Sequence, residues 1–260
     1  MAFAQTAARR PIAGAVATLG VSDRVAFLRK TYGLLGVALV AFALLTGGLM
    51  VYATGFSASF TRWALDGYDW LLVIGLFMVV GIVAQKLAQS ETSPALQYLG
   101  LGIAVTAEAI LLQPMLWILM IKFGGDVSML FGPTTHVAMS ARASSILLEA
   151  VVITLAIFIG LTAVVFITKK DFSFLRGVLT ICAFGVLGII VASLLFGFSL
   201  GALFSGFVIL LMAGYILYQT SLVMSYFPPS GYVAAALMLF STIATLFWYV
   251  LRILMEMNRR

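Results

Sequence analysis

The fold class of this chain is decided by residues 177–251, which read GVLTICAFGVLGIIVASLLFGFSLGALFSGFVILLMAGYILYQTSLVMSYFPPSGYVAAALMLFSTIATLFWYVL and contain no Asp, Glu, Lys, Arg or His. A water-soluble domain needs charged side chains on its surface for solubility. The stretch is long enough for three membrane crossings of about 20 residues each. It therefore predicts three consecutive transmembrane helices.

The composition of the whole chain agrees with this segment. Mean hydropathy is +1.16 and only 9% of residues are charged, against about 25% in soluble domains. The net charge of +6 collects at the ends of apolar segments and forms no basic face, so nucleic-acid binding is not expected. The single cysteine, Cys182, excludes an internal disulfide. An integral membrane protein in contact with the lipid bilayer is predicted.

Seven apolar runs are bounded by charges, Gly or Pro. Each can cross about 30 Å of hydrocarbon as a helix, and only helices satisfy every backbone group within such a segment. The predicted fold class is therefore all-α, a polytopic bundle of seven transmembrane helices. The runs are Thr31–Ala53, Trp70–Ala88, Ala95–Ile121, Ser145–Thr168, Phe174–Phe196, Leu200–Val223 and Tyr232–Leu251.

The distribution of Lys and Arg predicts a cytoplasmic N-terminus, because cytoplasmic loops carry the excess of positive charge. We expect residues 1–23 to form a flexible cytoplasmic tail and residues 24–260 a single transmembrane domain. Seven crossings place Arg252, Arg259 and Arg260 on the other side, against this rule. Either the last run tolerates this, or one segment re-enters the membrane instead of crossing it.

Two acidic residues lie within apolar runs, Glu108 in the third and Glu149 in the fourth. A charge inside a membrane is costly, so such acids usually face the interior of the bundle and mark an ion or proton path. The alternative for each is a structural role. Glu108 can hold two helices together by a hydrogen bond, and Glu149 can lie at the level of the lipid headgroups.

Enzymatic activity is not expected. The only histidine, His136, lies in a predicted loop, so neither a His-based metal site nor a catalytic triad can form within one chain. No phosphate-binding glycine motif followed by Lys occurs. The sequence therefore predicts no catalytic residues and no cofactor.

Five segments of the chain carry a resemblance to known proteins: RVAFLRKTYGLL (24–35), ILLEA (146–150), ITKKDFSFLRG (167–177), YILYQTS (215–221) and LFWYVLRIL (246–254). They resemble the Bax inhibitor-1 family of membrane proteins, including a bacterial branch with modulators of a membrane-bound protease. The element ITKKDFSFLRG is the most specific of the five.

The resemblance implies a bundle whose C-terminal helix lies at the centre. It also implies an association with pH-sensitive calcium leak and with protection against stress or cell death. Leak-channel members carry an Asp pair on the sixth and seventh helices, which closes the pore by sharing a proton. In this chain Gln219 and Thr242 occupy those two positions. These side chains have no proton to lose in the physiological range, so any leak should lack that pH response.

Two functions remain open. The first is a leak channel or transporter for cations, such as calcium, with Glu149 and Glu108 as polar stations and Gln219 with Thr242 as the constriction. The second is a non-conducting partner or modulator of a quality-control protease, or a regulator of stress or cell death, with the N-terminal tail as its contact. The Ala- and Gly-rich composition favours a bacterial inner membrane.

Overall fold

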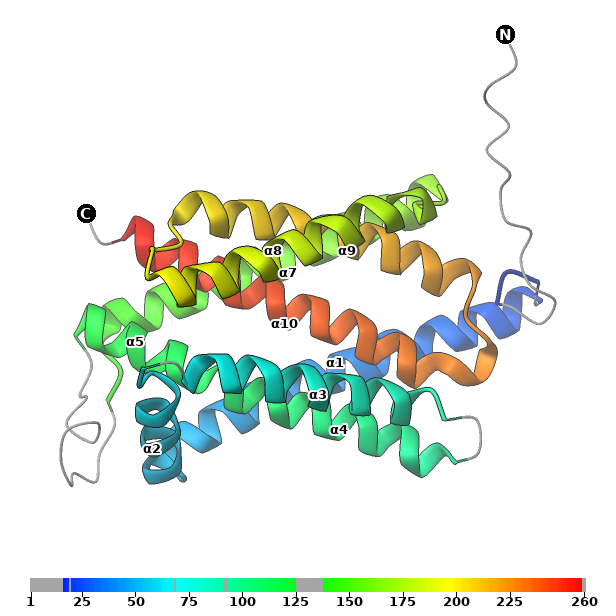
Figure 1. The fold of residues 1–260 in the computed structure, drawn as a ribbon. Helices are drawn as coiled ribbons and strands as arrows, with labels where there is room; N and C mark the ends of the chain where they lie inside the picture. Colours follow the sequence, from blue (N-terminus) through cyan, green and yellow to red (C-terminus); the bar gives the residue numbers. More distant parts are fainter. Residues whose placement is uncertain (1–15, 19, 68, 91–92, 125–137, 259–260) are drawn as a thin grey trace, which may run out of the picture.

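A computed structural model describes residues 16–18, 20–67, 69–90, 93–124 and 138–258 (Figure 1). Within these ranges all regular structure is helical, which confirms the all-α prediction. Other residues used above lie outside the described residues; they are 1–15, His136, Arg259 and Arg260.

Seven helical segments of the described residues are long and apolar enough to cross a membrane, and each overlaps one of the predicted runs. The third consists of two helices in series, α4 and α5. The long helices are α1 (Val21–Val51), α3 (Asp69–Ala88), α4 (Pro94–Leu111), α7 (Ala141–Thr168), α8 (Arg176–Phe196), α9 (Ala202–Ser225) and α10 (Tyr232–Met257). The short ones are α2 (Thr54–Ala64), α5 (Gln113–Phe123), η1 (Val16–Thr18), η2 (Ser173–Leu175) and η3 (Pro229–Gly231).

The last helix, α10, is the most deeply buried span. Within its most apolar window 78% of residues are buried, against 6% for the span that contains α8. It packs against α1, α4, α7 and α9 (Figure 1). Small side chains at Ala234, Ala235 and Ala236 let neighbouring helices approach it closely, as is common where lipid provides no hydrophobic drive for association.

Side-chain contacts locate the two membrane boundaries along α10. On the side where α1 begins, Tyr232 donates or accepts a 3.0 Å hydrogen bond with the Tyr98 hydroxyl, and Lys30 Nζ lies 5.6 Å from the centre of the Tyr232 ring. Lys and Tyr are typical of membrane interfaces. Arg252 follows Tyr232 by 20 residues, about 30 Å along a helix, which equals the usual hydrocarbon thickness. We call the boundary at Tyr232 the N-terminal side and the boundary at Arg252 the C-terminal side.

The sequence did not predict α2 or the break between α4 and α5. Pro114 has no backbone N–H, so the helix is interrupted there. A buried network joins the break to α2: the Ser57 hydroxyl donates to Gln113 Oε1 at 2.7 Å, and Trp117 Nε1 donates to Ser57 Oγ at 2.8 Å. The Gln113 amide in turn donates to the Ala109 carbonyl at 2.9 Å. The polar side chains at the break are thus satisfied inside the bundle.

The predicted boundary between tail and membrane domain at residue 23 differs from the structure. Helix α1 already begins at Val21, and Val16 is fully buried in the core. The Val16 N–H donates to the Phe227 carbonyl at 2.9 Å, and Arg24 Nε donates to the Val16 carbonyl at 3.4 Å. Burial of an apolar side chain at the end of α9 therefore extends the folded domain towards the N-terminus.

One glycine contact gives a stability prediction. A Cβ atom on Gly100 would lie 2.5 Å from the Ala84 carbonyl oxygen and 2.8 Å from the Ala88 nitrogen, because α3 and α4 touch there. Gly100→Ala should lower the free energy of unfolding by about 1–3 kcal/mol, measured in detergent micelles. Gly102→Ala is the matched control on the same helix, since nothing lies within 4 Å of its Cβ position. Equal unfolding stability of the two variants would contradict the contact.

Candidate functional site

Gln219 on α9 and Thr242 on α10 face one another inside the bundle. The Thr242 hydroxyl donates to Gln219 Oε1 at 2.8 Å and also lies 3.2 Å from the Met238 carbonyl of its own helix. The two side chains are only 8% and 7% exposed. The structure therefore brings together the two residues that sequence comparison placed at the acid-pair positions.

The geometry arises from the hairpin of α9 and α10. The chain reverses through residues 226–231, so the two helices run antiparallel and pack along their length. Buried apolar side chains flank the pair on both helices, with Ile216 and Val223 on α9 and Leu239 on α10. A hydrogen bond between neutral groups in such surroundings is shielded from competition by water. The pair can tie the two helices together, and it can bind or release no proton in the physiological range.

Glu108 lies at the same membrane depth as this pair. It follows Tyr98 on α4 by ten residues, and Thr242 follows Tyr232 on α10 by ten. Because the tyrosine hydroxyls are bonded and the helices run in the same direction, both residues lie about 15 Å from the N-terminal-side boundary. Glu108 is 8% exposed.

The structure does not join Glu108 to the Gln219–Thr242 pair. Tyr98 on α4 and Tyr232 on α10 face one another across the contact between these two parallel helices. Ten residues further along each helix, the side-chain direction has turned by the same angle and in the same sense. Glu108 and Thr242 therefore lie on opposite sides of the α4–α10 contact. The Glu108 carboxyl makes no hydrogen bond within the part of the chain that the structure describes. Leu112, one turn beyond Glu108 on the same face, lines a cavity on that other side.

Glu149 lies apart from the other three predicted residues. Ile146 and Ala150 take the buried face of α7, and Glu149 is exposed on the outward face. Arg142 donates to the Asn258 carbonyl at 2.9 Å, and Asn258 lies six residues beyond Arg252. Glu149 follows Arg142 by seven residues along α7, in the direction of the membrane. This step brings Glu149 from the level of Asn258 to the C-terminal-side boundary, within about one helical turn. The prediction that Glu149 faces an interior pathway is thus not met by its orientation, and its place agrees with the headgroup-level alternative.

Two of the segments that carry the family resemblance meet where α9 ends, at the membrane boundary that we call the N-terminal side. The Ser221 hydroxyl accepts a hydrogen bond from the Phe172 N–H at 3.3 Å. Asp171 Oδ2 accepts from the Tyr226 hydroxyl at 2.9 Å, and its Oδ1 accepts from the Ser173 N–H at 2.8 Å. The KKDFSF turn (169–174) therefore contacts α9 at Ser221, which lies only two residues from Gln219. Sequence reasoning identified both motifs but could not predict that they bind each other.

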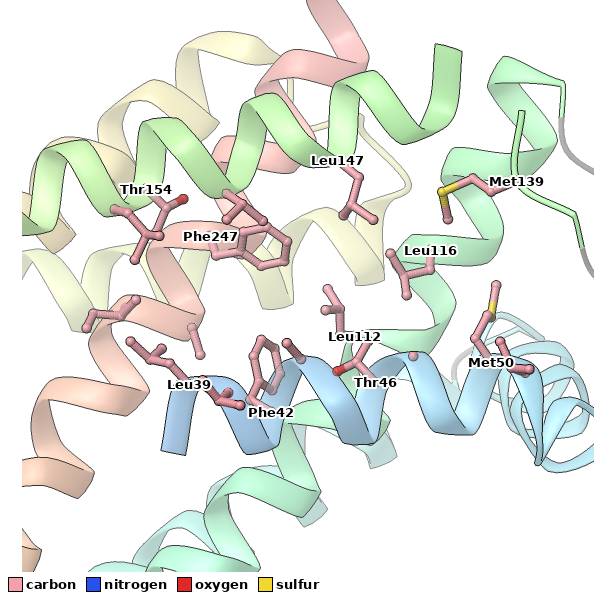
Figure 2. Close-up of a pocket in the computed structure, with 18 of the residues that line it drawn as sticks. Leu39, Phe42, Thr46, Met50, Leu112, Leu116, Met139, Leu147, Thr154 and Phe247 are labelled. Carbon is pink, nitrogen blue, oxygen red and sulfur yellow. The ribbon is translucent and has the colours of Figure 1, made fainter. Parts of the chain in front are cut away.

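A second feature that sequence reasoning missed is an apolar cavity of about 640 Å³ (Figure 2). Its walls come from α1 and α7, and its floor from α5 and α10, as Figure 2 shows. Two hydroxyls among its lining side chains, those of Thr46 and Thr154, are buried without a hydrogen-bond partner. The described residues hold no cluster of three or more His, Cys, Asp or Glu that could bind a metal ion.

Comparison with known proteins places these features in a family context. A family model described as Inhibitor of apoptosis-promoting Bax1 matches residues 114–260. The chain is 29% identical over 244 residues to Bax inhibitor 1 of Schizosaccharomyces pombe, covering 92% of this chain and 79% of that protein. It is 27% identical over 250 residues to Protein lifeguard 4 of Mus musculus, covering 94% and 91%. A Golgi anti-apoptotic protein of vaccinia virus is 26% identical over 250 residues, covering 94% and 91%. No solved structure matches.

The hydrogen bond between α9 and α10 can be measured by a double-mutant cycle. Thr242→Val should reduce the free energy of unfolding by about 1–3 kcal/mol, because it leaves the buried Gln219 Oε1 without its donor. Gln219→Leu should reduce it by about 0.5–1.5 kcal/mol, because the Thr242 hydroxyl keeps only the Met238 carbonyl as an acceptor. The double variant should lose less than the sum, with a coupling of about 0.5–3 kcal/mol. Thr245→Val is the control, since the Thr245 hydroxyl bonds only the Ser241 carbonyl of its own helix. Strict additivity would show that the pair contributes no interaction energy.

Proposed function

Because the chain belongs to the Bax inhibitor-1 family, we propose that it provides a leak pathway for cations, calcium among them, that the Gln219–Thr242 hydrogen bond holds closed. The observation that carries this proposal is the 2.8 Å contact at the positions where the resemblance implies an acid pair. The contact joins the most buried helix, α10, to its hairpin partner α9. Separation of the two helices would open the interior at mid-membrane depth.

The closed state of such a gate depends on one neutral hydrogen bond and the packing around it. A buried bond of this kind contributes about 1 kcal/mol net. Opening is therefore controlled by forces that move α9 relative to α10, and proton release takes no part. The KKDFSF turn, which binds α9 through Ser221 and Tyr226, is the contact through which such a force would reach Gln219.

Glu108 lies at the depth of this gate but on the other side of the α4–α10 contact, so it serves as a polar station of the proposed pathway only if opening also separates α4 from α10. It is the only carboxylate at the depth of the gate within the described residues, and carboxylate oxygen is a suitable ligand for calcium. One carboxylate forms a weak site, which suits passage of an ion better than its retention. Glu149 has no part in this pathway because of its outward orientation at the membrane boundary.

The proposed orientation places the N-terminal side in the cytoplasm of a bacterial cell. Most of the described Lys and Arg residues, which lie in and near the ends of the helices, are on that side, as the positive-inside rule requires. They are Arg24, Arg29, Lys30, Lys86, Lys169, Lys170 and Arg176, against Arg62, Lys122, Arg142 and Arg252 on the other side.

The proposed gate predicts an unusual pH profile. In a Glu108→Gln background, which removes the one carboxyl group proposed for the pathway, calcium efflux from vesicles that contain the purified protein should vary little from about pH 5 to about pH 8, since neither gate residue titrates there. The double variant Gln219→Asp, Thr242→Asp should acquire a pH response. A shared proton closes the carboxylate pair at low pH, and its loss drives the two charges apart, so efflux should rise as pH increases. Gln219→Asn, Thr242→Asn is the neutral control. A steep pH response of the wild-type protein that Gln219→Ala abolishes would refute the proposed gate.

A non-conducting modulator of a membrane protease or of cell-death signalling is the second candidate. It is favoured by the isolation of Glu108, and by the docking of Val16 against the end of α9. The names of the fungal and viral relatives, Bax inhibitor 1 and Golgi anti-apoptotic protein, agree with a role in cell-death control.

Two variants distinguish the candidates. For a leak pathway, Glu108→Gln should change the calcium, sodium or proton efflux ratio, and deletion of residues 1–15 should leave efflux intact. For a tail-mediated modulator, the deletion should abolish capture of the protease and Glu108→Gln should have no effect. Ending the deletion before Val16 preserves the contact with Phe227, so the fold is kept. Absence of efflux in every variant would rule out the leak pathway.

A further inference from the structure

The cavity in Figure 2 is a groove that opens sideways between α1 and α7. Its rim is exposed: Val40 and Val51 on α1 are 60% and 63% exposed, and Val151 on α7 is 38% exposed. Its floor is deeply buried, with Leu112 at 3% and Met120 at 0%. Both wall helices pack on α10, which keeps them apart at this level.

Two glycines of α1 create much of the free space. Gly36 and Gly47 line the groove, and nothing lies within 4 Å of the position that a Cβ atom would take on either. Tight helix contact is the usual reason for glycine in a membrane helix. These two glycines do the opposite and leave room beside the helix backbone.

The groove lies within the hydrocarbon layer. From Gly36 to Val51 it extends about 22 Å along α1. Gly36 is six residues, about 9 Å, from the level of Lys30 at the N-terminal-side boundary, and Val51 reaches the opposite boundary. A volume of about 640 Å³ falls in the range of ligand-binding pockets. An apolar groove of this kind does not hold water, and if empty its lining would lose dispersion contacts.

The C-terminal-side end of the groove combines positive charge with an unpaired hydroxyl. Met139 lines this end, and Arg142 follows it by three residues, with its guanidinium 5.5 Å from the centre of the Phe123 ring. Thr46 is 7% exposed and its hydroxyl has no partner. It lies about 24 Å from the level of Lys30, close to the boundary at which lipid ester groups begin.

We propose that this groove binds one acyl chain of a bilayer phospholipid from the C-terminal-side leaflet. The acyl chain lies along Gly36 and Gly47, with its ester end towards Thr46, whose hydroxyl can donate to an ester carbonyl. The headgroup points towards the level of Arg142 beyond the C-terminal-side boundary. The apolar walls, the lateral opening at bilayer depth and the basic end together match a lipid with an anionic headgroup. The inference does not depend on the proposed gate, because Gln219 and Thr242 do not line the groove.

The test uses the full chain in vesicles of phosphatidylethanolamine and phosphatidylglycerol, with a trace of phosphatidylglycerol that carries a photoreactive group in one acyl chain. After irradiation, mass spectrometry locates the labelled residues. We expect labelling of the groove faces of α1 and α7 above that of α8, which faces annular lipid along its length. Gly47→Leu should reduce the groove labels at least about tenfold. This is the loss of binding affinity expected when roughly two methylene groups of the acyl chain are no longer buried in the groove.

Matched variants make the result specific. Gly33→Leu is the control, because Gly33 is also exposed with nothing within 4 Å, but does not line the groove. Ala43→Leu is a second filling variant in case Gly47→Leu fails to fold. Arg142→Gln should weaken competition by unlabelled phosphatidylglycerol relative to phosphatidylcholine.

Three results would overturn the proposal. Labelling of the groove equal to that of α8, and unchanged by both filling variants, would mean annular lipid only. Displacement of the label by a free fatty acid more readily than by phospholipid, with no effect of Arg142→Gln, would identify a fatty acid as the occupant. Loss of groove labels in Gly33→Leu as well would show that the effect is not local.

Discussion

Burial of α10 among its neighbours is the constraint on which this structure depends. In a bilayer the helices gain no hydrophobic free energy by associating, so shape and a few polar contacts must hold them together. The alanine-rich first turns of α10 allow α1, α4, α7 and α9 to approach it. The depth of Thr242, the register of the α9–α10 hairpin and the separation of α1 from α7 all follow from this packing.

The bundle satisfies its buried polar side chains in two different ways. Ser57, Gln113 and Trp117 form a closed network at the break between α4 and α5. Gln219 and Thr242 form a single bond between two helices. The first arrangement stabilises a helix junction. The second adds one hydrogen bond between helices that already pack along their length.

Glycine likewise serves two opposite purposes. At Gly100 the missing side chain allows the α3 and α4 backbones to touch, since any Cβ atom there would collide with the Ala84 carbonyl. At Gly36 and Gly47 the missing side chains leave open space beside α1. Composition alone does not separate these cases, because the residue type is the same and only the neighbouring helix differs.

The sequence by itself determined the all-α class, the seven spans and the neutral residues at positions 219 and 242, because run length and charge depend on local composition. Only the tertiary structure decided which face of each helix points inward. Along α7 both faces are apolar, so nothing in the pattern around Glu149 signals that it faces outward. The contact of Gln219 with Thr242 was expected only from the family resemblance, and helix α2 and the lateral groove were beyond sequence reasoning. The direction in which each side chain points depends on how its helix is rotated about its axis, and packing between uniformly apolar helices sets that rotation.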